Sequence, residues 1–221
     1  MNKIAKALTL VPMIALLALG AGAAQADDGG LLKDASFELK LPADEGGWDT
    51  FEISMFSRNY ARSGSQSMFN AGFSRTVPYN PFFLGNASGA FQEFPAEPGS
   101  RWRLTGYGLT PRPLVGTPAF GILQLSFFDA KGKDLGTVET ADGDVKAKGS
   151  NQINNQSAVE EWIFLDTGVV TAPARTATVQ AFTLYVDYSG SDITQGVYFD
   201  DLTLYAVDGD EVAMTSRNAS P

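Results

Sequence analysis

Short stretches in which apolar and polar residues alternate recur along the chain. The alternation is clearest over residues 102–107, 122–128 and 179–187. A period of two is typical of a β-strand with one face in a core and the other face outward. No stretch shows a convincing helical period, and no internal repeat is visible. The pattern predicts an all-β protein, folded as a single antiparallel β-sandwich.

In each of these stretches one set of alternating positions is apolar, and we expect this set to face the core. The inward set is Trp102 and Leu104, then Leu123, Leu125 and Phe127, then Phe182, Leu184 and Val186. The opposite set mixes aromatic rings with amide, hydroxyl and charged groups. It consists of Arg103, Thr105 and Tyr107, then Ile122, Gln124 and Ser126, then Thr183, Tyr185 and Asp187. An outward sheet face of this composition could bind a sugar.

The two ends of the chain differ from this pattern. Lys3 and Lys6 precede an apolar run over residues 7–21, and Ala24-Gln25-Ala26 follows as a small-residue cleavage site. Residues 1–26 therefore read as a signal peptide, and we expect a secreted protein in the periplasm or outside the cell. The rest of the sequence contains no long apolar run, so we expect no insertion into a membrane. The polar residues 208–221 are predicted to form a disordered tail, which leaves one β-sandwich domain over residues 31–207.

Composition narrows the possible chemistry. The chain has no His and no Cys, so the most common general base and the thiolate nucleophile are both missing. Paired carboxylates could still cleave a glycosidic bond, but a chain with 25 acidic residues offers such pairs by chance. We therefore expect no enzyme activity. The net charge of −9 becomes −11 without the two signal lysines (14 basic against 25 acidic residues), which disfavours nucleic acid as a partner.

Two adjacent acids, Asp200 and Asp201, lie inside the apolar, strand-like stretch 196–207. Aspartate is a poor strand former, and a buried carboxylate is costly unless something compensates its charge. A Ca²⁺ ion bound by carboxylate and carbonyl oxygens would do so. Backbone N–H groups or a solvated strand end would also do so, and the residues alone do not choose between these possibilities.

Motifs along residues 31–207 resemble a known family in their order and spacing. They are Asp34-Ala35-Ser36-Phe37-Glu38, Trp48, Arg62-Ser63-Gly64-Ser65-Gln66-Ser67, Glu97-Pro98-Gly99-Ser100-Arg101-Trp102-Arg103-Leu104, Phe127-Phe128-Asp129-Ala130-Lys131-Gly132, Trp162, Val170-Thr171-Ala172-Pro173-Ala174 and Tyr198-Phe199-Asp200-Asp201-Leu202. Together they resemble the carbohydrate-binding modules of families 4, 9, 16 and 22, which are galactose-binding-like jelly rolls. The resemblance implies a secreted, non-catalytic module that binds a poly- or oligosaccharide.

The same resemblance implies a structural Ca²⁺ that joins the first and last strands. Its ligands would be Glu38, one of Asp200 and Asp201, and backbone carbonyls around residues 63–65. Strand alternation places Asp200 on the inner face together with Leu202 and Leu204.

For the sugar we expect Tyr107 and Tyr185 as stacking planes, with hydrogen bonds from Arg103, Gln124 and Asp187. Tyr79 and Phe82, from a Pro-bounded aromatic loop, could wall the groove.

Other interpretations stay open at this point. The tyrosines could merely decorate a solvated sheet. The protein could be a structural or adhesive component of the cell envelope or matrix that uses the sandwich as a scaffold, or, less plausibly, a glycoside hydrolase. Trp102 and Trp162 are predicted in the core, whereas the environment of Trp48 is ambiguous. A monomer is expected.

Overall fold

A computed structural model describes residues 30–72, 87–115, 119–140, 152–188 and 195–207. The predicted signal peptide, the predicted tail, and Tyr79 and Phe82 all lie outside these residues. Apart from one short 3₁₀ helix, η1 (Ala43–Glu45), the elements of the described residues are β-strands. No helix in these ranges is long and apolar enough to cross a membrane.

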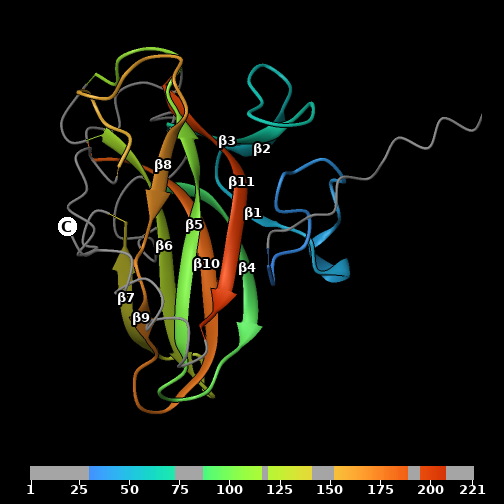
Figure 1. The fold of residues 1–221 in the computed structure, drawn as a ribbon, viewed down its shortest axis with the longest axis vertical. Helices are drawn as coiled ribbons and strands as arrows, with labels where there is room; N and C mark the ends of the chain where they lie inside the picture. The colour runs from blue at the N-terminus through green and yellow to red at the C-terminus, as the bar shows by residue number, and fades with distance from the viewer. Residues whose placement is uncertain (1–29, 73–86, 116–118, 141–151, 189–194, 208–221) are drawn as a thin grey trace, which may run out of the picture.

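The strands form two sheets in which hydrogen-bonded neighbours run antiparallel (Figure 1). The five-stranded sheet has the order β1 (Asp49–Phe51), β4 (Ala87–Pro95), β10 (Thr176–Asp187), β6 (Ala119–Asp129) and β7 (Asp134–Glu139). The six-stranded sheet has the order β2 (Ser54–Ser57), β3 (Ser67–Ala71), β11 (Gly196–Ala206), β5 (Arg101–Leu109) and β8 (Ile163–Asp166), with β9 (Val170–Thr171) also paired to β5. The predicted all-β sandwich is confirmed.

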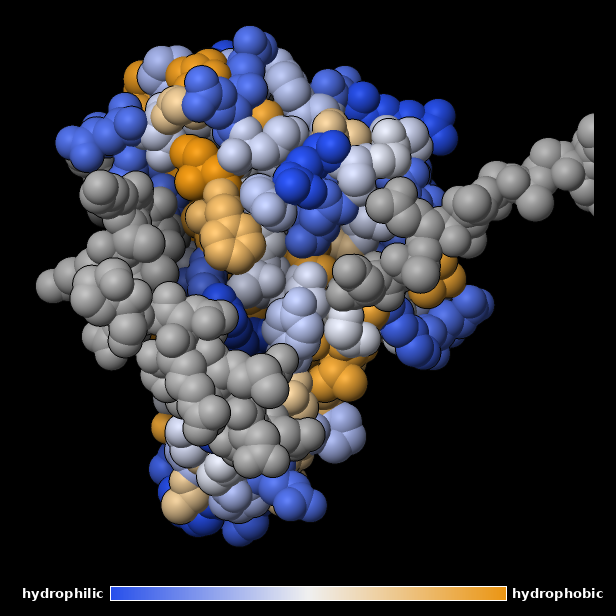
Figure 2. Space-filling model, viewed as in Figure 1, coloured by the Kyte–Doolittle hydropathy of each residue, from blue (hydrophilic) through white to orange (hydrophobic). Residues whose placement is uncertain are grey.

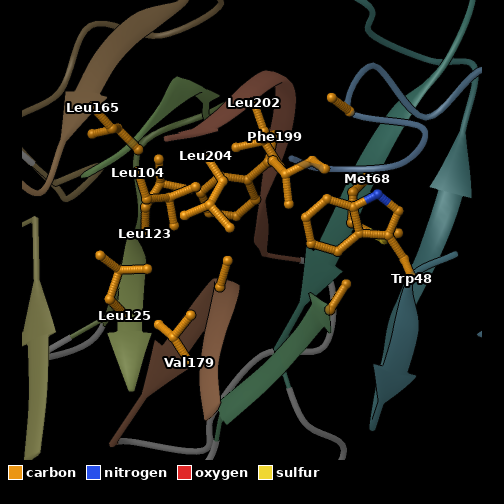
Figure 3. Packing of buried hydrophobic residues seen from close by; sticks show 14 of the residues in the cluster. Trp48, Met68, Leu104, Leu123, Leu125, Leu165, Val179, Phe199, Leu202 and Leu204 are labelled. Atoms are coloured by element: carbon orange, nitrogen blue, oxygen red, sulfur yellow. The ribbon is translucent and has the colours of Figure 1, made fainter. Parts of the chain in front are cut away.

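The two sheets enclose one large apolar core, and side chains from both sheets point toward one another (Figure 3). Leu123 and Leu125 of β6 face Leu104 of β5 and Leu204 of β11 across it. Burial of this apolar area supplies most of the driving force for folding, which matters in a chain with no cysteine for a disulfide. The inward positions predicted on β5 and β6 are therefore correct.

The prediction for β10 is wrong, because the face that is expected to be inward is the outer face of the sheet. Val179, Ala181 and Tyr185 point into the main core, and Tyr185 has no exposed surface. Leu184 and Phe182 lie instead in a second apolar cluster, which covers the opposite side of the five-stranded sheet. Both faces of this central strand carry large apolar residues, so alternation within the strand does not tell which face is inward.

The prediction for Asp200 is also wrong, because β11 contains a β-bulge. The pairing with β5 shifts between Asp200 and Thr203, and Asp201 has a positive φ of 48°. One extra residue on β11 reverses the side-chain alternation at this point. Phe199, rather than Asp200, therefore shares the inner face with Leu202 and Leu204.

The tryptophans fit the core to different degrees. Trp102 is buried as expected, and Trp162 is only half-buried. Trp48, whose environment the sequence leaves ambiguous, is buried against Phe37 with a ring-centroid distance of 5.0 Å. Its indole Nε1–H donates to the carbonyl oxygen of Asp34 at 2.9 Å, so this ring anchors the N-terminal segment to the sandwich.

Candidate functional site

The outer face of the five-stranded sheet carries a row of side chains that crosses all five strands. Strand register places them side by side in the order Asp49, Phe91, Phe182, Gln124 and Glu139. The rings of Phe91 and Phe182 lie 5.2 Å apart between centroids and are tilted by 32°. Adjacent strands are about 4.8 Å apart, so the row from Phe91 to Gln124 spans roughly 10 Å. We call these residues the aromatic row.

A polar row lies beside the aromatic row on the same face, in the order Glu93, Gln180, Ser126 and Thr137. The side chains are held by one another. Gln180 donates to Glu93 Oε2 at 2.7 Å, Gln124 donates to Ser126 Oγ at 2.8 Å, and the Ser126 and Thr137 hydroxyls are 3.0 Å apart. Amide and carboxylate groups are therefore fixed next to two partly exposed rings.

The other side of the aromatic row is apolar and closed. Ile122, Leu184 and Val186 are buried there, and Phe51 and Phe120 pack against them. This second cluster gives the sheet a firm outer layer. Among the described residues, the exposed part of this face is consequently the aromatic row with its polar neighbours.

The structure does not bring the predicted sugar-binding residues together. Gln124 lies in the aromatic row, whereas Tyr185 and Asp187 are buried on the inner side of β10. Arg103 and Tyr107 lie on the outer face of the other sheet, in β5. Their positions rule out one groove built from all five described residues.

Sequence reasoning missed Phe91 and misplaced Phe182. The strand that contains Phe91, residues 87–95, starts with small residues and has no clear alternation, so the sequence does not indicate which of its positions face outward. A useful signal is its Phe91-Gln92-Glu93 stretch, in which residues 91 and 93 share one face as a ring and a carboxylate.

The outer face of the six-stranded sheet holds Tyr107 in a closed setting. The Arg62 guanidinium carbon lies 3.5 Å from the centroid of the Tyr107 ring, and Phe164 meets this ring edge-on at 5.3 Å. A cation over an aromatic face is attracted by the ring quadrupole. Tyr107 is therefore not an open plane for stacking, in contrast to the sequence-based expectation.

The paired acids are compensated by donors from the loop between β2 and β3. Asp200 is wholly buried, and its Oδ2 accepts from the Arg62 N–H at 2.7 Å and the Ser63 N–H at 3.3 Å. Asp201 accepts from the Arg62 guanidinium and the Ser63 hydroxyl, both at 2.5 Å. Burial, with the nearby charge of Asp201 as a smaller cause, raises the pKa of Asp200 to about 7.

Glu38 holds the far end of the same loop. Its Oε1 accepts from the Ser65 and Gln66 N–H groups, each at 2.8 Å, and its Oε2 accepts from the Ser65 hydroxyl at 2.9 Å. Burial opposes the charge of Glu38, but these donors outweigh it and hold the pKa of its carboxyl below the usual value. Glu38, Asp200, Asp201 and residues 62–66 thus form a carboxylate clamp between the N-terminal segment and β11.

The clamp is also where Ca²⁺ is predicted. Within the described ranges, no group of three or more acidic side chains is close enough to hold a metal ion. A calcium site would therefore need carbonyl oxygens of residues 62–66 besides the carboxylates. A carboxylate has about four lone-pair sites, and Asp200 and Glu38 each use three for the hydrogen bonds from this loop and from the N–H of Asp201, so acceptor capacity remains.

No family model matches the chain, and no curated protein is similar to it in sequence. Solved structures are similar to it in fold. One is the enzymatically active domain of tailspike protein 4 from bacteriophage CBA120, with a TM-score of 0.50, 11% identity, and coverage of 81% of this chain and 22% of that chain. Another is the CBM22-1–CBM22-2 tandem domain of Xyn10C from Paenibacillus barcinonensis, with a TM-score of 0.50, 16% identity, and coverage of 84% and 48%.

A family 16 carbohydrate-binding module is also similar, with a TM-score of 0.47, 17% identity, and coverage of 80% of this chain and 99% of that chain. The chain thus spans about a fifth of the tailspike structure and about half of the tandem domain. At sequence identities this low, the similarity establishes only a shared fold. At that level the resemblance to carbohydrate-binding modules is confirmed, because the protein shares the β-sandwich fold of the CBM22-1–CBM22-2 tandem domain.

Proposed function

We propose that the protein is a secreted, non-catalytic module that binds a poly- or oligosaccharide on the outer face of the five-stranded sheet. The observation that carries this proposal is the aromatic row, in which Phe91 and Phe182 lie in register with Gln124 and next to the polar row. The fold shared with carbohydrate-binding modules supports it.

The chemistry of this face suits a neutral sugar. A pyranose presents an apolar C–H surface that can stack on the Phe91 and Phe182 rings, and its rim hydroxyls need amide and carboxylate partners. Gln124 supplies such a group beside Phe182 on the neighbouring strand, and Glu93 supplies one two residues along β4 from Phe91. Asp49, Glu93 and Glu139 make the described outward positions of these strands acidic, so polymers of uronic acids would be repelled.

Binding is expected to be weak. Each well-placed aromatic contact contributes about 0.5–1.5 kcal/mol beyond its buried area. A few such contacts, set against the cost of ordering the ligand, correspond to dissociation constants in the micromolar to millimolar range. Affinity gel electrophoresis detects binding of this strength.

The first prediction is retardation of the protein by at least one neutral polysaccharide among β-glucans, xylans and galactans, and none by alginate. Phe182→Leu keeps an apolar side chain in the second cluster but removes the ring, and should weaken the retardation, as should Gln124→Ala. Leu39→Ala, at a residue that is 66% exposed in the N-terminal segment, serves as the control and should bind normally.

Three results would contradict this proposal. Unchanged retardation of both variants, with unchanged melting temperatures, would remove the aromatic row as the site. Failure of every polysaccharide in a broad panel to retard the folded protein would favour the structural or adhesive scaffold. Release of reducing ends from any polymer would show that the protein is an enzyme.

The second prediction concerns Ca²⁺, which we propose as a structural ion at the carboxylate clamp, held by Glu38 and one of Asp200 and Asp201. An ion that binds only the folded protein stabilises it by about 2.7 kcal/mol at one hundred times its dissociation constant. EDTA should therefore lower the melting temperature, and added calcium should restore it. An unchanged melting temperature, with no calcium in elemental analysis, would mean that hydrogen bonds alone hold the clamp.

A further inference from the structure

The outer face of the six-stranded sheet carries exposed aromatic side chains that the proposed site does not use. Strand register sets Phe164 of β8 beside Tyr107 of β5, and Tyr205 of β11 beside Arg103 of β5. Phe164 is 49% exposed and Tyr205 is 43% exposed, far more than most aromatic residues of this sandwich. Figure 2, which has the view of Figure 1, shows hydrophobic side chains beside a hydrophilic hollow near the middle of one face of the molecule.

A fixed, planar ion pair lies between these two rings. Arg103 donates to Asp166 through Nε at 3.0 Å and through Nη2 at 2.6 Å. Asp166 is buried and also accepts from the Gly168 N–H at 2.8 Å, whereas 38% of the Arg103 side chain is exposed. A bidentate pair of this kind locks the guanidinium plane and compensates its charge. The partly exposed Arg103 side chain is therefore a fixed polar group on this face, and its charge is balanced by Asp166.

This arrangement has the elements that a sugar site needs. Rings at Phe164 and Tyr205 offer C–H stacking surfaces at two ends, and the Arg103–Asp166 pair supplies a planar polar group between them. Because the pair is neutral as a whole, the matching ligand is a neutral glycan. Tyr107 acts as a support, since it packs edge-on against Phe164 and is covered by Arg62 on its face.

We propose that this face is a second carbohydrate-binding surface, so that one protein molecule bridges two polysaccharide chains. The two surfaces lie on opposite sides of the sandwich, because one belongs to each sheet. Packed sheets are about 10 Å apart, so both surfaces can be occupied without contact between the two chains. The inference rests on the proposed function for the class of ligand, but it makes the protein a cross-linker rather than a simple binder.

The test compares binding with cross-linking for one soluble neutral polysaccharide that retards the wild type. The double variant Phe164→Ala/Tyr205→Ala should still be retarded, but it should lose the turbidity and viscosity increase that the wild type causes. Phe91→Ala/Gln124→Ala should likewise lose cross-linking and keep partial retardation. Only the combination of all four substitutions should abolish binding, and titration with a short oligosaccharide should show the stoichiometry falling from two to one in each double variant.

Several outcomes separate the two proposals. Complete loss of binding in Phe91→Ala/Gln124→Ala, with one oligosaccharide per wild-type molecule, would overturn the second surface and leave the proposed function intact. Loss of all binding only in Phe164→Ala/Tyr205→Ala would overturn the bridging role and move the site to the six-stranded sheet. Absence of binding by the wild type would overturn both. Leu39→Ala and thermal melts of each variant control for folding.

Discussion

Asp200 shows how a carboxylate is accommodated in the middle of a strand. It has no exposed surface, and its two oxygens accept N–H groups from Arg62, Ser63 and Asp201. The sequence correctly indicates that two adjacent acids need compensation. It does not identify the donors, because Arg62 and Ser63 are 138 and 137 positions away from Asp200 along the chain. Only the folded loop brings these backbone groups to the carboxylate.

The third prediction is a pH dependence that originates at this residue. The pKa of Asp200 is about 7 in the folded protein, because burial disfavours its charge, against an ordinary value of 3.8. Between these values the folded state holds a proton that the unfolded chain has released, so this group's contribution to the free energy of unfolding falls as pH rises. In EDTA, the urea midpoint of the wild type should decrease between pH 5 and pH 8.

Asp200→Asn should remove this decrease, because the amide does not titrate. Asp129→Asn is the control, since N–H groups of Lys133 and Lys131 lower the pKa of Asp129, which then titrates below this window. Equal slopes in the wild type and Asp200→Asn would contradict this prediction, because they would show that the N–H donors of the clamp keep the carboxylate ionised throughout this range.

At the scale of elements, the sequence predicts strands better than it predicts which of their faces are inward. On β6 the inward side is plain, because Leu123, Leu125 and Phe127 alternate with more polar neighbours such as Gln124 and Ser126. On β10 both faces are rich in apolar residues, and a second cluster on the outer side buries one of them. On β11 the bulge reverses the alternation at Asp201. The inward faces of β10 and β11 are therefore set by the elements packed against each strand, which alternation within the strand does not reveal.

The same limit explains the candidate site. Tyr107, Tyr185 and Gln124 are predicted on one surface, but they end on two different sheets and in the core. The amino-acid composition of one strand can indicate that its side chains could contribute to a sugar site, but it does not indicate which other strands lie beside it. Which strands combine depends on sheet order, and alternation within a strand carries no information about that order.

The fourth prediction concerns the close approach of β6 and β11 across the core. A Cβ atom at Gly121 would lie 2.7 Å from Cγ2 of Val197 and 2.9 Å from its Cβ. Val197 is β-branched and cannot easily rotate away. Gly121→Ala should therefore lower the free energy of unfolding by about 1–3 kcal/mol, measured by urea denaturation.

The added Val197→Ala change tests the reason. If the clash is the cause, Gly121→Ala/Val197→Ala should lose less stability than the sum of the two single variants. Simple additivity would show that the backbone of β6, rather than the side chain of Val197, requires glycine at this position.

At the scale of the whole molecule, the sandwich has two outer faces with different electrostatics. The described outward positions of the five-stranded sheet include Asp49, Glu93 and Glu139, whereas the six-stranded sheet places Arg103 and Arg62 on its outer side, each paired with an aspartate. With a net charge of −9 for the chain, neither face is a basic patch. Neutral polymers are therefore the partners that the two proposed surfaces would suit, and we expect the protein to act as a monomer.

The first and last described segments of the chain lie next to each other. Gly30 forms a parallel bridge with Leu204, and the Leu31 N–H donates to the Leu204 carbonyl oxygen at 3.0 Å. Val207 is three residues further along, about 10 Å away at the rise of a strand. A linker of about five residues could therefore join Val207 to Gly30, which makes the domain a candidate for circular permutation.

The fifth prediction is that a permutant with this linker and new termini in the exposed turn at Ala130 and Lys131 folds to the same sandwich. Its far-ultraviolet circular dichroism should match that of residues 30–207 in their natural order, and it should be retarded by the same polysaccharide. A permutant opened inside β10, which pairs with strands on both sides, should fail to fold and serves as the contrast. This pair of results would show that the fold of the domain depends on its strand pairings and not on where the chain begins and ends.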